Sequence, residues 1–176
     1  MVSTTESDDS REVVGQTIIT RQAQEKDLDD IVALAHQQEV ELKKSDPTRT
    51  IPSLDSLREI YRQRLHGRVG NQRYGIFVAD SNHAIGAYSF VRVPVSRKSP
   101  LYGLVQGIYT DQQLRGHGVA DMLIQRMADF AKASGATSLK GDAYPGSNGQ
   151  RFFEEKRRWK RERVMPNGLI RLTRDI

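Results

Sequence analysis

The sequence contains no cysteine and no apolar run that approaches the ~20 residues of a membrane-spanning helix. The missing cysteine excludes disulfides, thiolate metal sites and a cysteine nucleophile. The first ten residues are polar and acidic, which argues against a secretory signal. These absences predict a protein of a reducing, cytoplasmic setting with no membrane partner.

Cations outnumber anions by 27 to 22, and the surplus is concentrated in Lys156–Arg163. Basic surface attracts anions, whether nucleic acid, acidic protein or a phosphorylated cofactor. A nucleic-acid-binding domain in which Trp159 stacks on a base is one hypothesis, and it is disfavoured because only this one aromatic residue interrupts the basic run. His36, His66, His83 and His117 lack the spacing of a metal site, so no metal is predicted.

The length of 176 residues suits one domain, and a hydrophobic fraction of 37% is enough to build its core. Residues 1–15 show no periodicity and are predicted to form a disordered tail. The domain is then expected to span residues 16–176.

Hydrophobic periodicity predicts the order β-α-α-β-β-β-α-β-α-β-β, a mixed α/β sheet with a right-handed parallel crossover at its centre. Strands are expected at Thr17–Thr20, Tyr74–Ala79, Ala84–Val93, Leu101–Thr110 and Thr137–Ala143, and on both sides of the Pro166–Gly168 turn. Helices are expected from an N-cap at Asp27 to Asp46, from a cap at Ser53 to Gly67 with Leu54 facing inward, and over Gly116–Ser134 and Gly149–Lys156.

A glycine turn joins the expected strand Leu101–Thr110 to the expected helix Gly116–Ser134. In Arg115-Gly116-His117-Gly118, backbone N–H groups are free to point at a ligand, and the positive end of the helix suits a pyrophosphate. A dinucleotide fingerprint is not complete, because Asp121 stands where a small residue is needed, and the Gly-Lys-Ser/Thr of a P-loop does not occur. The turn by itself is compatible with ligand binding or with simple packing.

The segment Gln113-Leu-Arg-Gly-His-Gly resembles the Gln/Arg-x-x-Gly-x-Gly/Ala motif of the GCN5-related N-acetyltransferases, the GNAT superfamily. The strand before it and the amphipathic helix after it fit the same family, as do Asp142–Gly146 and Arg151–Glu155. The resemblance covers about Thr17 to Arg174. It implies a GNAT-type mixed central sheet with splayed parallel strands flanked by helices.

The resemblance also implies acetyl-CoA as a cosubstrate, held between Leu104–Thr110 and Leu139–Ala143 where Gly107 lies near a bulge. Asn148 would bond the pantetheine arm from the opposite side. The other implied contacts of the cofactor are Ile108, Tyr109, Thr110, Arg115, Gly116, His117, Gly118, Val119 and Ala120.

The implied reaction is direct attack by a primary amine of a small molecule or peptide on the thioester. The sequence departs from the family pattern at two positions, because Gln106 lies on a strand without a carboxylate and Phe153 replaces a tyrosine. Tyr144 is the nearest phenol, and it is either the acid that protonates the leaving thiolate or a residue that packs over the short helix. His117 is expected to face solvent, and Asp142 to be a surface carboxylate.

The two missing side chains leave open a protein that binds CoA without transferring anything, as an interaction or sensing module. The basic segment Ser96–Ser99 and Arg49 hint at an acidic or phosphorylated acceptor, while Glu39 and Glu41 are candidates to reach the same site. The sequence identifies neither the amine acceptor nor the oligomeric state, for which a homodimer is one candidate.

Overall fold

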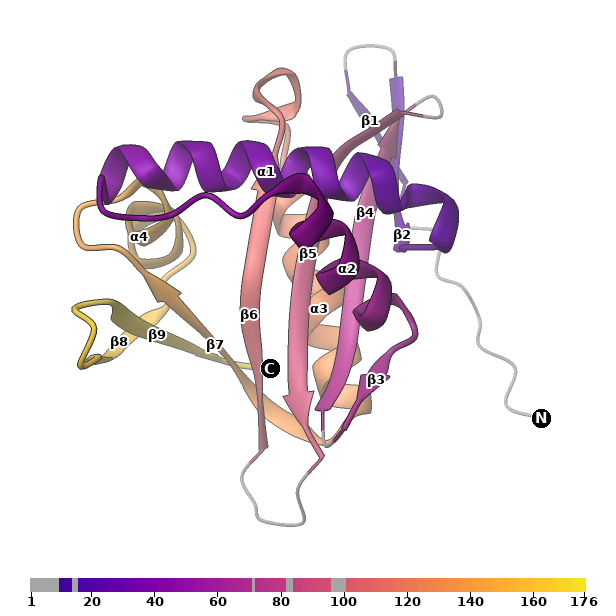
Figure 1. Ribbon diagram of the computed structural model, residues 1–176. Coiled ribbons are helices and arrows are strands. Elements are labelled where there is room, and N and C mark those ends of the chain that lie inside the picture. The colour runs from indigo at the N-terminus through magenta and orange to yellow at the C-terminus, as the bar shows by residue number, and fades with distance from the viewer. Residues whose placement is uncertain (1–9, 14–15, 71, 82–83, 96–100) are drawn as a thin grey trace.

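The computed structural model describes residues 10–13, 16–70, 72–81, 84–95 and 101–176. Within this part of the chain nine strands form one sheet in the order β1-β2-β4-β5-β6-β7-β9-β8, with β3 paired to β4 (Figure 1). The strands are β1 (Ser10–Val13), β2 (Gln16–Gln22), β3 (Arg68–Val69), β4 (Gln72–Ser81), β5 (Ala84–Pro94), β6 (Leu101–Thr110), β7 (Ala136–Ala143), β8 (Lys160–Val164) and β9 (Ile170–Asp175). The helices are α1 (Leu28–Ser45), α2 (Leu54–Leu65), α3 (Val119–Ala133) and α4 (Asn148–Arg151), which continues as a π-helical turn over Phe152–Lys156.

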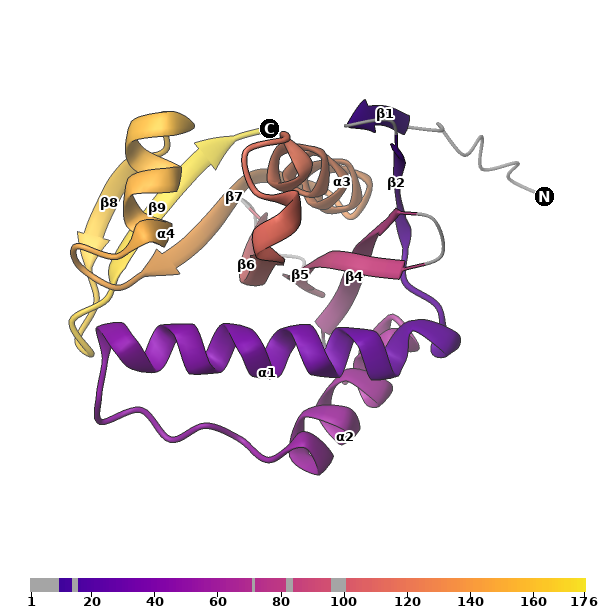
Figure 2. The same ribbon diagram turned by 90° about the horizontal axis from the view of Figure 1, so that it is seen from above.

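Helices cover both faces of the sheet, as expected for this order of elements. Figure 2 shows α1 and α2 on one face and α3 and α4 on the other. Under α3 the core contains Leu123, Met127 and Leu139, all with no exposed surface. Under α1 and α2 it contains Ile31 and Tyr88. The predicted mixed α/β architecture is confirmed.

The helix starts follow the predicted capping only in part. Ser53 caps α2 by accepting a hydrogen bond from the Ser56 amide, as predicted. Asp27 precedes α1 but does not cap it, because its carboxylate accepts hydrogen bonds from the Gln24 amide and from Arg21 instead. Leu54 was expected to face inward and is 50% exposed, whereas Leu57 and Tyr61 of the same helix are buried.

The expected tail lies partly outside the described residues. Ser10–Val13 form β1, which pairs antiparallel with β2, whereas residues 1–9 and 14–15 are not described. His83 and Ser96–Ser99 lie outside the described residues as well. In the part of the chain that is described, no helix is both long and apolar enough to cross a membrane.

The pair β6 and β7 opens into a gap at one end. The two strands run parallel and are paired from Leu101–Ala136 to Val105–Gly141. Beyond this point β6 continues over residues 106–110 and β7 over residues 142–143 without pairing to each other, and the two strands diverge in Figure 1. We call this opening the β6–β7 gap. It results from the predicted bulge, because Gly107 pairs with Phe90 and Val105 with Val91, which leaves Gln106 as the extra residue.

Candidate active site

Two cavities meet at the β6–β7 gap. The α1-side cavity, about 410 Å³, is lined by Gln38, Arg49, Gln106 and Tyr144 among others. The α3-side cavity, about 730 Å³, lies at the start of α3 and is lined among others by Arg115, Gly116, Gly118, Ala120 and Phe152. Both cavities share the lining residues Glu41, Ile108, Tyr109, Asn148, Gly149 and Phe153. The gap therefore gives a ligand on one side access to a molecule on the other.

The glycine turn exposes backbone donors to the α3-side cavity. Gly116 and Gly118 have φ angles of +82° and +79°, so α3 begins at Val119 and not at the predicted Gly116. No hydrogen bond within the described chain uses the N–H groups of residues 116–120, whereas that of Asp121 donates to the Gly118 carbonyl over 3.0 Å. A Cβ at Gly116 would meet nothing within 4 Å. This open cradle fits an anionic group such as a diphosphate.

The sequence predicted that His117 faces solvent, and this prediction is only partly right. The ring of His117 is half buried, and its Nδ1 atom is shielded from water with no hydrogen-bond partner in the described chain. A shielded nitrogen without a partner is costly unless a bound group satisfies it. The turn therefore contains two kinds of polar group without a partner in the described chain, which are the backbone N–H groups and the Nδ1 atom of His117.

Asp121 does not oppose an anion in the α3-side cavity, despite the expectation from its charge. Its carboxylate forms an ion pair with Arg157, through both Nε and Nη2 of the guanidinium. The same guanidinium lies over the ring of Phe152, 5.0 Å from the ring centroid. The charge of Asp121 is therefore balanced within the cavity wall.

Arg115 is folded back across the end of β6. Its Nη2 atom donates to both carboxylate oxygens of Glu41 over 2.8 and 3.0 Å, and its Nε donates to the Thr110 carbonyl over 2.9 Å. The hydroxyl of Tyr109 donates to the same carboxylate over 3.0 Å. Burial and the hydrogen bond to Glu41 raise the pKa of Tyr109, so this phenol stays protonated at neutral pH.

Tyr144 lies in the α1-side cavity and belongs to a chain of three side chains. Its hydroxyl accepts a hydrogen bond of 2.6 Å from Nη1 of Arg49, and Arg49 donates to Glu39 over 2.5 and 3.0 Å. The bond to Glu39 raises the pKa of Arg49, which is fully charged. Sequence reasoning named all three residues separately but had no signal that joins them, because the loop after α1 brings Arg49 to Tyr144.

Asp142 is exposed, as expected of a surface carboxylate, and it is also paired. It accepts hydrogen bonds from Arg171 of β9, the neighbouring strand, whose side chain is buried. Sequence reasoning missed Arg171 because nothing in its own segment distinguishes this buried cation from the exposed cations of the chain. Its role follows only from the register that places Asp142 opposite Arg171.

A buried relay of hydrogen bonds reaches the β6 backbone from α2. Tyr61 donates to Tyr88 over 3.1 Å, Tyr88 to Oε1 of Gln38 over 2.5 Å, and Nε2 of Gln38 to the Ile108 carbonyl over 3.1 Å. Burial raises the pKa of Tyr61 to about 12 and also raises that of Tyr88. Both phenols stay neutral, and the relay fixes Gln38 beside the gap. The sequence carried no sign of it.

The other residues named from the sequence also line the cavities. Ile108 and Tyr109 line both of them, and Thr110, Val119 and Ala120 line the α3-side cavity. Asn148 lies at the start of α4 on the opposite side, where its Oδ1 accepts a hydrogen bond of 2.8 Å from Arg151. The elements thus bring together the predicted cofactor residues around one opening.

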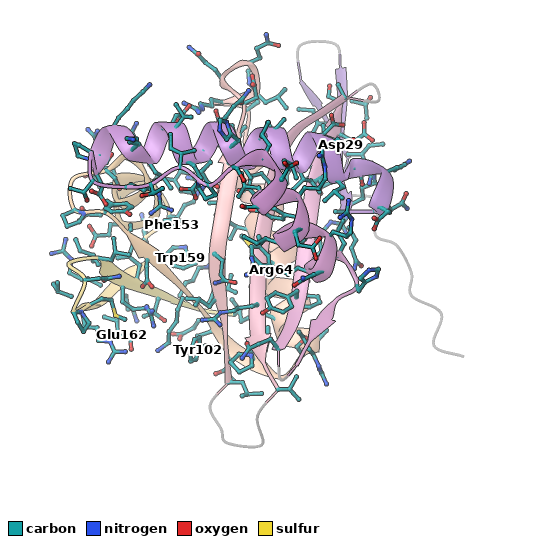
Figure 3. All side chains as sticks on the ribbon, in the orientation of Figure 1. Asp29, Arg64, Tyr102, Phe153, Trp159 and Glu162 are labelled. Atoms are coloured by element: carbon teal, nitrogen blue, oxygen red, sulfur yellow. The ribbon has the colours of Figure 1, made fainter. Side chains whose placement is uncertain are left out.

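The basic run Lys156–Arg163 does not present an aromatic ring for a nucleic-acid base. Trp159 is 3% exposed and packs on Phe153 with ring centroids 4.7 Å apart (Figure 3). Arg161 forms an ion pair with Glu154. In the described residues, no cluster of three or more histidine, aspartate or glutamate side chains is arranged to hold a metal ion.

Comparisons with known proteins agree with this geometry. Residues 36–157, more than half of the chain, match the profile of the Acetyltransferase (GNAT) family. No curated protein matches the sequence. Among solved structures, an N-acetyltransferase from Staphylococcus aureus Mu50 is 21% identical and superimposes with a TM-score of 0.67 over 90% of this chain and 98% of its own.

Two further similar structures contain a form of coenzyme A. The PaiA N-acetyltransferase from Thermoplasma acidophilum, in complex with coenzyme A, is 12% identical with a TM-score of 0.68 over 90% of this chain and 99% of its own. YncA from Salmonella typhimurium, with its cofactor acetyl-CoA, is 14% identical with a TM-score of 0.68 over 90% of this chain and 93% of its own. These likenesses establish the fold, and together with the family profile they show that the chain belongs to the GNAT family of acetyltransferases.

Proposed function

We propose that this protein transfers the acetyl group of acetyl-CoA to a primary amine of a small molecule or peptide. The observation that carries this proposal is the pair of cavities that meet at the β6–β7 gap, one of which lies beside the open backbone donors of the glycine turn. The transferase unit spans residues 16–176, and β1 adds a strand to its edge.

The α3-side cavity is the proposed cofactor site. The backbone donors of residues 116–120 and the side chain of Arg115 hold the diphosphate. His117, which the sequence also named, does not line this cavity. The stretch of β6 from Ile108 to Thr110, which pairs with β5 but not with β7, lies along the pantetheine arm, with Asn148 across the gap. The Ile108 carbonyl already accepts a hydrogen bond from Gln38, which leaves one of its two lone pairs for the arm.

The α1-side cavity is the proposed acceptor site. An ammonium loses a proton to become a neutral amine, whose nitrogen bonds to the acetyl carbon as the carbon–sulfur bond breaks. The nitrogen then loses a second proton while the thiolate takes one up, which gives an amide, free CoA and one proton for solvent. Tyr144, held by Arg49, is the proposed proton donor to the thiolate.

A protein that binds CoA without transfer is the second candidate function. It is favoured by one observation, which is that Gln106 occupies the bulge at the gap and neither it nor Phe153 supplies a titratable group. Proximity of the two reactants still provides much of a rate enhancement when such groups are missing.

A thiol-release assay with acetyl-CoA and a panel of primary amines separates the two candidates. We expect thiol release that depends on the amine and saturates with it. Tight binding of CoA in calorimetry, combined with no thiol release on any amine, would overturn the transferase and leave the binding module.

A further inference from the structure

Glu41 of α1 links the two cavities. Its carboxylate lines both of them, and it accepts hydrogen bonds from Tyr109 and from Arg115. Arg115 itself lines only the α3-side cavity. The ion pair of Glu41 and Arg115 therefore connects a wall of the acceptor site with the cation of the proposed cofactor site.

The charges of the α1-side cavity are otherwise balanced within its wall. Among the described residues, the charged side chains that line this cavity are Glu41, Arg49 and Asp142. Arg49 is paired with Glu39, and Asp142 with Arg171. Only Glu41 has a partner that belongs to the other cavity. Loss of that partner would leave one uncompensated negative charge facing the acceptor.

The ion pair of Glu41 and Arg115 is easily exchanged. Both side chains are 43% exposed. Ion pairs this exposed contribute about 0–1 kcal/mol, whereas a diphosphate beside the turn offers Arg115 a stronger anionic partner. Besides Glu41, Arg115 contacts the Thr110 carbonyl through Nε over 2.9 Å and the ring of Tyr109, whose centroid lies 5.4 Å from the guanidinium carbon. Both residues line the α3-side cavity, so Arg115 is already positioned at the edge of the proposed cofactor site.

We propose that Glu41 is a specificity residue for the acceptor, released by Arg115 only when the diphosphate of CoA is bound. The proposal rests on the proposed function. Once released, the carboxylate accepts hydrogen bonds from a cationic ammonium group, with the Tyr109 hydroxyl still attached to it.

This arrangement selects a class of acceptor. A net negative charge attracts an alkylammonium group and disfavours an amine that carries a carboxylate. The acidic or phosphorylated acceptor suggested by Arg49 is not supported here, because Glu39 already neutralises that guanidinium. The basic segment Ser96–Ser99, the other part of that suggestion, lies outside the described residues.

The Glu41→Gln variant tests the proposal because it should weaken binding of the amine without weakening binding of CoA. The affinity for CoA should stay unchanged or rise by up to about fivefold, since Arg115 is no longer held by a carboxylate. The KM for butylamine should rise by about 10- to 100-fold, because a hydrogen bond to a charged group is lost. Calorimetry measures the first quantity and thiol release the second. Glu59→Gln on the exposed side of α2 is the matched control and should change neither.

A weaker affinity for CoA in Glu41→Gln would overturn the proposal, since it would mean that Glu41 only positions Arg115 for the cofactor. An unchanged KM would overturn it as well.

A second experiment compares butylamine with 4-aminobutyrate as acceptors of the wild-type protein. A preference for 4-aminobutyrate, the amine that carries a carboxylate, would contradict the proposal. If the wild-type protein binds CoA but releases no thiol with any amine, the proposed acetyl transfer is refuted, and the role of Glu41 needs a test that does not depend on turnover. In that case calorimetric binding of butylamine, with and without CoA, tests Glu41 separately.

Discussion

Gly118 is the residue on which the proposed diphosphate cradle depends most. Its φ of +79° is in the left-handed region, where a side chain costs about 1–2 kcal/mol, and its N–H group has no partner in the described chain. Gly118→Asp should abolish measurable CoA binding, because a carboxylate then lies beside the bound diphosphate. Isothermal titration calorimetry measures this loss directly.

Gly168→Asp is the matched control for that variant. Gly168 lies in the turn between β8 and β9 with a φ of +81° and with nothing within 4 Å of the added Cβ. The same backbone strain and the same charge should lower stability comparably and leave CoA binding intact. Unchanged CoA affinity in Gly118→Asp would refute the cradle.

Tyr144→Phe removes the proposed proton donor together with the hydrogen bond that it accepts from Arg49. The hydroxyl is bonded to Arg49, so the substitution should lower kcat by about 10- to 100-fold and leave the affinity for CoA unchanged. Steady-state thiol release with a confirmed amine provides the measurement. Tyr102→Phe, at the closed end of β6 where its ring packs under Lys140, is the control. Full turnover in Tyr144→Phe would mean that the phenol only packs over α4.

Local motifs predicted some residues of the site, and long-range contacts account for the rest. Gly116, Gly118 and Arg115 are recognisable because a strand, a glycine turn and a helix follow each other in the sequence. Gln38 and Tyr88 are separated by 50 residues, and no spacing rule links them before the sheet is assembled. Arg171 was missed for the same reason, since only the register between β7 and β9 gives it a partner.

At the scale of elements, the start of α1 is fixed to the sheet by a network of charges. Arg21 of β2 donates to Asp27 over 2.6 and 2.9 Å and to Asp80 of β4 over 3.1 Å. Burial acts to raise the pKa of Asp27, yet the hydrogen bonds from Arg21 and the Gln24 amide lower it below its usual value. Since α1 forms a wall of the proposed acceptor site, this network holds that wall in place although its own residues do not line the cavity.

The lowered pKa of Asp27 predicts how stability depends on pH. An aspartate whose pKa is lower in the folded state stabilises that state above its unfolded pKa of about 3.9, and this contribution is lost as pH falls through the folded value. Asp27→Asn should lower the free energy of unfolding at pH 7 by about 1–3 kcal/mol and make it fall less on acidification. Urea unfolding at pH 7 and near pH 3 measures both effects. Asp29→Asn, at an exposed neighbour, should behave as wild type, and an Asp27 variant as acid-sensitive as wild type would contradict the account.

The elements themselves were largely predictable because their periodicities are strong. The strand Leu101–Thr110 was predicted to the residue, and the bulge at Gly107 followed from glycine in a strand. The short strands β1 and β3 were missed, because two to four residues are too few to show an alternation. The start of α3 was placed three residues early, since a glycine turn and the first turn of a helix look alike in sequence.

At the scale of the whole molecule, the fold supports the site by separating two strands that would otherwise pair. The α3 face and the α1 face of the sheet each hold one cavity, and the β6–β7 gap joins them. The pattern of strands and helices predicted this opening through the GNAT resemblance. The shape and charge of the acceptor side depended on α1 and on the loop with Arg49, whose positions were not predictable from local sequence.

The most direct test is a crystal structure of the protein soaked with CoA. The diphosphate should lie within hydrogen-bond distance of the backbone nitrogens of residues 116–120, and the thiol should enter the β6–β7 gap. Arg115 should then contact phosphate, with Glu41 facing the α1-side cavity. An empty turn, or a gap filled by side chains at saturating CoA, would contradict the account.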